Sequence, residues 1–151
     1  MKSSIMGQVV GILILFIGLI ILPTYYIGIV NWRDDMNTCQ NAARNFVDMV
    51  IDNQQITDKA VSDLNLELAG CNSTYVYTVY REEKVTNPDG QGGFITTWNH
   101  VEITDDTVWR QGDIVTIEIS QRGLNIYQRI SALMLGTGYT KIDVRLSGMV
   151  R

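Results

Sequence analysis

The sequence predicts an α+β protein in which a long N-terminal helix packs on a small, mostly antiparallel β-sheet. Three observations predict this class. The chain carries no charge between Lys2 and Arg33, an apolar stripe at helical spacing follows, and β-branched and aromatic segments alternate with turn residues in the C-terminal half. With 151 residues, 46% of them hydrophobic and 19% charged, the chain has room for one ordinary domain and is neither disordered nor collagen-like.

The first helix is predicted from the uncharged N-terminal segment. Residues 9–22 are all apolar or Gly, and Tyr25 and Trp32 follow. About 20 apolar residues span the ~30 Å hydrocarbon core of a bilayer, where a single segment must be helical to satisfy its backbone. Aromatic residues favour the membrane interface. A cleaved secretory signal has a shorter apolar run, of about 7–15 residues, and a small-residue cleavage site. The sequence therefore favours a retained membrane anchor.

The distribution of charge indicates how the chain is oriented and divided. Lys2 places the N-terminus inside and the C-terminus outside the cell membrane by the positive-inside rule. We therefore expect residues 1–31 to form a leader and a transmembrane or filament-core helix, and residues 32–151 to form an extracytoplasmic α+β domain. The exterior part has 16 acids against 11 bases, a net charge of −5. No nucleic acid is expected as a partner, because binding to phosphates needs a basic surface.

An apolar stripe continues the helix beyond the membrane. Its members recur at intervals of 4-3-4-3-4 and are Trp32, Met36, Cys39, Ala43, Phe46 and Val50. This heptad spacing predicts one continuous helix from about Ile5 to Asp52. The outer, amphipathic half of that helix is counted as part of the exterior domain. Pro23 is expected to kink or loosen it, because proline removes one helical hydrogen bond.

The stripe has two interpretations, and both can hold along one helix. Its outer half packs on the protein's own domain, or its membrane half packs against other copies of the chain. Small residues let helix backbones approach closely in lipid, and Gly7 and Gly11 form such a pair. The expected helix-packing residues are Gly7, Gly11, Gly18, Tyr25, Trp32 and Met36.

The rest of the chain alternates between helical and strand patterns. Thr57 is a predicted N-cap and Gly70 a predicted stop for a second helix, with Val61, Leu64 and Leu68 on its apolar side. The remaining elements are a hairpin of strands 74–86 and 94–104 across the turn 87–93, a strand 113–122, a short helix or apolar connection 124–135, and a last strand 139–149. In strand 113–122, Val115, Ile117 and Ile119 are expected on one face.

The only two cysteines are Cys39 and Cys71. Both lie outside the cytoplasm in the inferred topology, where disulfides persist. A bridge would close a loop of about 32 residues and stabilise the fold by about 3–4 kcal/mol in the chain-entropy model. The alternative is two buried free thiols. The sequence favours the disulfide.

Little in the sequence indicates catalysis. His100 is the only histidine and has no predicted nucleophile beside it, so a partly exposed strand residue is expected. Asp105 and Asp106 resemble a polar turn or a helix start. Residues 87–90 contain fragments of a calcium loop but lack its acidic spacing, so a hairpin turn is favoured. No nucleotide-binding, hydrolase or metal motif occurs. We expect no enzymatic activity, no cofactor and no metal.

Several segments together resemble a known family. These are the short leader around residues 4–8, the helix 9–50, and a C-terminal sheet with its cysteines. The layout resembles type IV pilins and pseudopilins. Within them it is most similar to TadE-like small membrane proteins of tight-adherence or conjugation loci of Gram-positive bacteria, by likeness at residues 45–48, 55–57, 112–113 and 147–150.

The resemblance implies a structural subunit of a cell-surface filament. Such a subunit resides in membrane lipid before assembly and then associates with further copies of itself through its N-terminal helix. It also implies peptidase cleavage between Gly7 and Gln8. The sequence departs from the family here, because the glutamate expected five residues after the cleavage point is Ile12. The alternative function is a single-pass accessory protein of a secretion, adhesion or conjugation machine.

Overall fold

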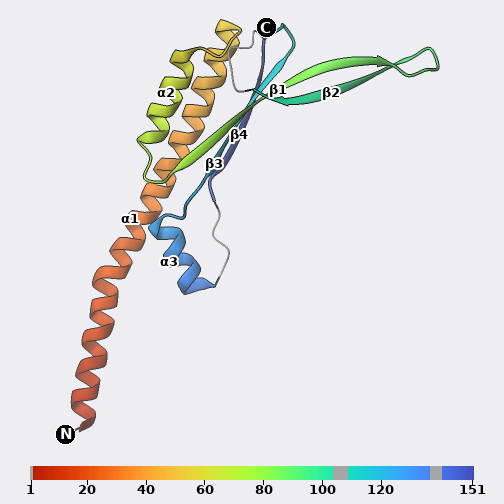
Figure 1. Ribbon diagram of the computed structural model, residues 1–151. Coiled ribbons are helices and arrows are strands. Elements are labelled where there is room, and N and C mark those ends of the chain that lie inside the picture. The colour runs from red at the N-terminus through yellow and green to blue at the C-terminus, as the bar shows by residue number, and fades with distance from the viewer. Residues whose placement is uncertain (1, 104–108, 137–140) are drawn as a thin grey trace. The chain divides into compact units, whose positions relative to one another are not determined.

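The computed structural model describes residues 2–103, 109–136 and 141–151. Its elements, shown in Figure 1, are α1 (Lys2–Asn53), α2 (Asp58–Ala69), β1 (Tyr75–Pro88), β2 (Phe94–Glu102), β3 (Ile114–Gln121), α3 (Ile126–Leu135) and β4 (Asp143–Met149). A long N-terminal helix packs on a four-stranded antiparallel sheet, which confirms the predicted α+β class. The sequence left segment 124–135 open between a short helix and an apolar connection. The structure shows a helix over Ile126–Leu135.

The chain divides into two compact units. The N-terminal unit comprises Met1–Asp34 and Leu124–Thr140, and the sheet unit comprises Asp35–Gly123 and Lys141–Arg151. The first division therefore falls close to the boundary expected at residues 31–32. Segment 124–140, expected within the exterior domain, groups instead with the N-terminal part of α1.

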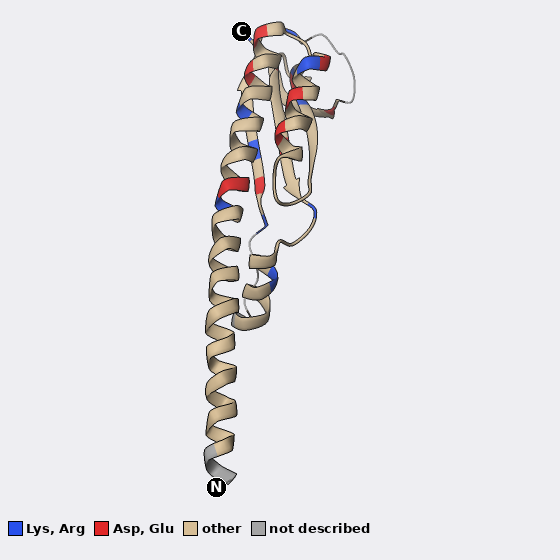
Figure 2. Cartoon of the chain, turned by 90° about the vertical axis from the view of Figure 1, so that its left-hand side faces the viewer, with Lys and Arg blue, Asp and Glu red and all other residues tan. Residues whose placement is uncertain are grey.

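Helix α1 continues through Pro23 without a break. Its observed start and end agree with the expected helix from about Ile5 to Asp52. The Thr24 hydroxyl donates to the Ile20 carbonyl at 2.7 Å, a common way for a hydroxyl to satisfy helical carbonyls. The helix is long and apolar enough to cross a membrane. Figure 2 shows a long tan stretch of α1 without charged residues, and in the sequence no charged residue lies between Lys2 and Arg33.

The outer part of α1 packs within the sheet unit. Cys39, Ala43, Phe46 and Val50 are fully buried, which confirms the outer half of the predicted stripe. Met36 is the exception, because its side chain is exposed and Asp35 is buried in its place. Asp35 lies four residues before Cys39 and so shares its face of the helix. A search for apolar residues at helical spacing misses Asp35, because Asp35 is charged and is buried against polar partners.

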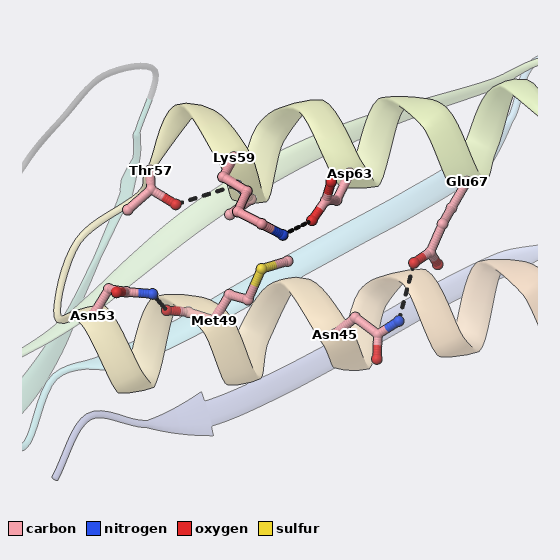
Figure 3. A network of polar contacts seen from close by, with 8 residues as sticks. Asn45, Met49, Asn53, Thr57, Lys59, Asp63 and Glu67 are labelled. Atoms are coloured by element: carbon pink, nitrogen blue, oxygen red, sulfur yellow. Dashed lines mark hydrogen bonds and ion pairs between the residues drawn. The ribbon is translucent and has the colours of Figure 1, made fainter.

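Helix α2 lies beside the outer part of α1 (Figure 3). The Thr57 hydroxyl accepts the Ala60 N–H at 3.2 Å, and the Gly70 N–H donates to the last turn of the helix, so both predicted ends are confirmed. Ala60 is fully buried while Val61 is only half-buried. The amide of Asn45 in α1 donates to the Glu67 carboxylate at 3.0 Å. The buried side chains of α2 are Ala60, Leu64 and Leu68.

The sheet has the strand order β2-β1-β3-β4, and every neighbouring pair is antiparallel. Val115, Ile117 and Ile119 are fully buried on one face, as the alternating pattern predicted. Gly148 of β4 lies on the same face. A Cβ atom at this position would come within 2.6 Å of Val47 Cγ1 and Ile51 Cδ1 in α1. The glycine therefore permits β4 to approach the helix closely.

The β1–β2 hairpin extends beyond the other strands of the sheet (Figure 1). Its turn is organised by Asp89, whose Oδ1 accepts the N–H groups of Gln91 and Gly93, each at 2.8 Å. This confirms the predicted hairpin but with a shorter turn, because Asn87 and Pro88 still pair with Ile95 and Phe94 and the chain reverses over residues 89–93. Every residue of β2 is exposed. Asp105 and Asp106 lie outside the described residues, and β4 begins at Asp143 rather than at residue 139.

Candidate assembly surface and buried cysteine cluster

The N-terminal part of α1 presents an exposed apolar surface. Most large side chains from Ile5 to Val30 are exposed. Gly7, Gly11 and Gly18 lie along this part of the helix, and a Cβ atom at any of them would meet nothing within 4 Å. The described chain therefore makes no close approach at these glycines. They are open to another helix or to lipid.

Helix α3 covers α1 near the end of the apolar run. The Tyr127 ring lies 5.1 Å from that of Tyr25 and 6.1 Å from that of Trp32, centroid to centroid. A Cβ atom at Gly28 would come within 2.6 Å of Tyr127 Cβ. Gly28 thus permits the contact between the two helices. Tyr25 and Trp32, expected to pack between helices, pack on a helix of their own chain.

Sequence reasoning missed Gly28 and Tyr127. The available signal was a glycine that lies three residues after Tyr25 and four before Trp32, on the same helical face. For the other residues expected in assembly, the structure of a single chain shows no contact that tests packing between copies. Met36 is exposed, and Gly7 and Gln8 lie inside α1. Cleavage between Gly7 and Gln8 stays a prediction.

Cys39 of α1 and Cys71, just after α2, interact as neighbouring free thiols. Burial, the adjacent Cys71 and the charge of Asp35 together raise the pKa of Cys39 to about 12. Burial and the charge of Asp35 also raise the pKa of Cys71. The structure brings together the two residues that the sequence paired. The disulfide itself stays a prediction.

The Asp35 carboxylate is the polar centre of this cluster and is only 1% exposed. Its Oδ1 accepts the backbone N–H of Asn72 at 2.8 Å and the side-chain amide of Asn72 at 3.0 Å. Its Oδ2 accepts the Tyr75 hydroxyl at 3.2 Å. Burial, followed by the charge of Asp35, raises the pKa of Tyr75. The carboxylate ties α1 to the α2–β1 connection and holds Cys71 close to Cys39.

An open groove of about 570 Å³ borders this cluster between α2 and β1. Cys71, Asn72 and Tyr75 are among the residues that line it. The side-chain amide of Asn72 is engaged by Asp35. Among the described residues that line the groove, none forms the set of nucleophile, base and orienting residue that acyl transfer requires.

Two further polar clusters have structural roles. The Arg81 guanidinium pairs with Asp113 across 3.0 Å and lies 5.8 Å from the Trp109 ring, which ties β1 to the start of β3. His100 lies on β2, partly exposed as expected, with its ring 4.1 Å from that of Tyr80. Among the residues that the structure describes, no three His, Cys, Asp or Glu side chains are grouped so that they could hold a metal ion.

Comparison of the chain with protein-family models, with curated proteins and with solved structures finds no match in any of the three. The exposed helix, its contact with α3 and the cysteine cluster are the features on which a function can rest.

Proposed function

We propose that the protein is a structural subunit of a cell-surface filament. Before assembly, α1 anchors it in the cell membrane with the N-terminus inside and the sheet unit outside. After assembly, the same helix packs against further copies in the core of the filament. One observation carries the proposal: the apolar N-terminal part of α1 is exposed and uncharged, while its outer part belongs to a folded unit.

The physical argument rests on the apolar area involved. Burying one Leu, Ile or Phe side chain contributes about 1.5–3 kcal/mol. Between Ile5 and Val30 most such side chains have no cover from the described chain. A bilayer removes them from water, and so does a bundle of identical helices. A filament subunit uses both environments in turn.

The open glycines support packing between copies. Without a hydrophobic driving force in lipid, helices associate by close packing at small residues. Gly7, Gly11 and Gly18 leave free space along α1. This proposal agrees with the function implied by the resemblance to type IV pilins and pseudopilins.

The test is to shear filaments from cells and to identify their subunit by mass. We expect this chain in the filament fraction, and we expect Gly18→Leu to lower the filament yield several-fold without changing the stability of the sheet unit. Ile17→Leu is the control, because Ile17 is the exposed neighbour of Gly18 and the change conserves volume. Filaments without this chain, or an equal yield from Gly18→Leu, would contradict the proposal.

N-terminal sequencing of the mature chain tests the processing step separately. A mature start at Gln8 supports cleavage by a prepilin-type peptidase. A start at Met1 supports an unprocessed membrane anchor. The filament proposal depends on the first experiment and not on this one.

A second candidate function is supported by β2. All nine residues of this edge strand are exposed, and they include Phe94, Ile95, Trp98 and Val101. Exposed apolar edge strands commonly mark sites of pairing with another chain. They favour a single-pass accessory protein that binds partners of a secretion, adhesion or conjugation machine through its sheet. Co-purification with membrane machinery, rather than with sheared fibres, would support this function.

A further inference from the structure

Helix α3 has an inverted distribution of polar and apolar side chains. Gln128 and Ser131 are buried, with 1% and 8% of their surfaces exposed. Ile126, Leu133 and Met134 are exposed to 61%, 87% and 61%. Their spacing puts them with Ile130 on one side of the helix, at positions i, i+4, i+7 and i+8. A helix that faces water shows the opposite pattern, so this side of α3 requires an apolar environment.

The depth of α3 along α1 is set by its contacts. Tyr127 packs on Tyr25, Gly28 and Trp32, which lie at the outer end of the apolar run. Figures 1 and 2 both show α3 running from this contact toward the N-terminal end of α1. Leu133 follows Tyr127 by six residues, which is about 9 Å of helix. The exposed side of α3 therefore lies at the depth of the uncharged part of α1.

The charge of this segment also differs from that of the rest of the exterior chain. Residues 122–141 contain three bases, Arg122, Arg129 and Lys141, and no acid. The chain as a whole has a net charge of −4. A basic segment with exposed apolar side chains is typical of helices that lie in an anionic membrane surface.

We infer that α3 is a second membrane contact of this protein, a short helix that lies against α1 and inserts Ile126, Leu133 and Met134 into the outer leaflet of a bilayer with anionic lipids. The inference rests on the proposed residence of α1 in the membrane. Membrane burial of α3 removes its apolar side from water, while exposed Arg129 reaches the headgroups.

Spin labels on the full-length chain test this inference in vesicles of phosphatidylcholine with phosphatidylglycerol. Each label replaces one residue in the Cys39→Ser/Cys71→Ser protein, whose circular dichroism must match that of the unsubstituted chain. Leu133→Cys reports on α3, Ile14→Cys on the apolar run, and Leu66→Cys on an exposed apolar position of α2. Oxygen concentrates in lipid and a nickel chelate in water, so their collision rates with each label report its environment.

We expect the labels at positions 14 and 133 to favour oxygen several-fold over the label at position 66. A label at 133 that collides with nickel while the label at 14 favours oxygen would overturn the inference and leave α1 in the membrane. Nickel access at both positions would overturn both proposals. A label at 133 that neither reagent reaches would show that protein covers α3, which also overturns the inference.

The role of charge has its own control. Arg129→Gln should lower the ratio of inserted to free α3 about fivefold, the effect of one base near an anionic surface. Arg44→Gln, an exposed base of the sheet unit, should leave it unchanged.

If the double serine variant does not fold, hydrogen exchange of the unsubstituted chain replaces the labels. Exchange in Ile126–Leu135 should then be slower in anionic vesicles than in phosphatidylcholine alone, and equal rates would overturn the inference.

Discussion

Asn72 donates two hydrogen bonds to one oxygen of Asp35, from its backbone N–H at 2.8 Å and from its side-chain amide at 3.0 Å. The two residues are 37 positions apart in the chain. Their contact joins the start of the sheet unit to the connection between α2 and β1. The contact also holds Cys39, one helical turn after Asp35, close to Cys71, which directly precedes Asn72.

Removal of this carboxylate should destabilise the sheet unit. Asp35→Ala leaves the Asn72 N–H and the Tyr75 hydroxyl without their acceptor, which should lower the free energy of unfolding by about 2–4 kcal/mol. Asp35→Asn keeps one acceptor oxygen and should cost less. Urea unfolding of the full chain in detergent, followed by circular dichroism, measures both. Asp34→Ala is the control, since Asp34 is exposed, and it should change stability by less than about 0.5 kcal/mol.

Cys39 and Cys71 should form a disulfide when the protein is exposed to oxidised glutathione. Two thiols then lose two protons and two electrons to the glutathione disulfide, and an Sγ–Sγ bond forms. The intact mass should fall by that of two hydrogen atoms, and the free energy of unfolding should rise by about 3–4 kcal/mol. Cys71→Ser should abolish both changes. If both cysteines still react with iodoacetamide after treatment with oxidised glutathione, the predicted pairing is contradicted.

The reduced protein should lose stability at alkaline pH. Burial and the neighbouring Cys71 and Asp35 raise the pKa of Cys39 from 9.0 to about 12. The unfolded chain therefore releases this proton at lower pH than the folded chain, and the stabilisation is complete below about pH 9 and lost as the pH rises toward 12. The raised pKa of Tyr75 acts in the same direction.

Urea unfolding of the reduced full chain at a series of pH values measures this loss. Cys39→Ala should flatten the dependence of unfolding free energy on pH, and Tyr75→Phe should flatten it independently. A dependence that stays the same in both variants would assign it to other groups.

Gly148→Ala should disturb the packing of β4 on α1. The added Cβ would come within 2.6 Å of Val47 Cγ1, which a β-branched side chain cannot easily move, and of Ile51 Cδ1. Overpacking of this kind costs about 1–3 kcal/mol. Gly123→Ala is the matched control, because its Cβ would meet nothing within 4 Å. Equal stability of the two variants would show that β4 and α1 are farther apart than described.

Most of the fold could be predicted because its signals are local. The uncharged run, the caps at Thr57 and Gly70, and the alternation in β3 each follow from the sequence within one element. Two features of the structure were not predicted, and they have a shared cause. Asp35 replaces Met36 on the buried face, and segment 124–140 groups with the N-terminal part of α1. Both depend on residues distant in sequence, which a pattern within one element cannot detect.

The candidate assembly surface and the cysteine cluster were predicted only in part, because some of their contacts join residues that are distant in sequence. Cys39 and Cys71 were expected close together because they are the only two cysteines of the sequence, and the structure places them in contact. Gly28 was missed because its partner, Tyr127, is 99 positions later in the sequence. The inverted pattern of α3 was missed because the sequence shows which residues are apolar, but not which side of the helix is covered.

The discontinuity of the sheet unit has a consequence for the order in which it can fold. Strand β4 pairs with β3, yet the chain between them leaves the unit to form α3 and returns at Lys141. The sheet therefore gains β4 only after residues Lys141–Arg151, which follow α3 in the chain, have been synthesised. Until then β3 has an unpaired edge and Gly148 has not reached α1. A nascent chain that lacks Lys141–Arg151 is thus an incomplete folding unit, even though β1, β2 and β3 have all been synthesised.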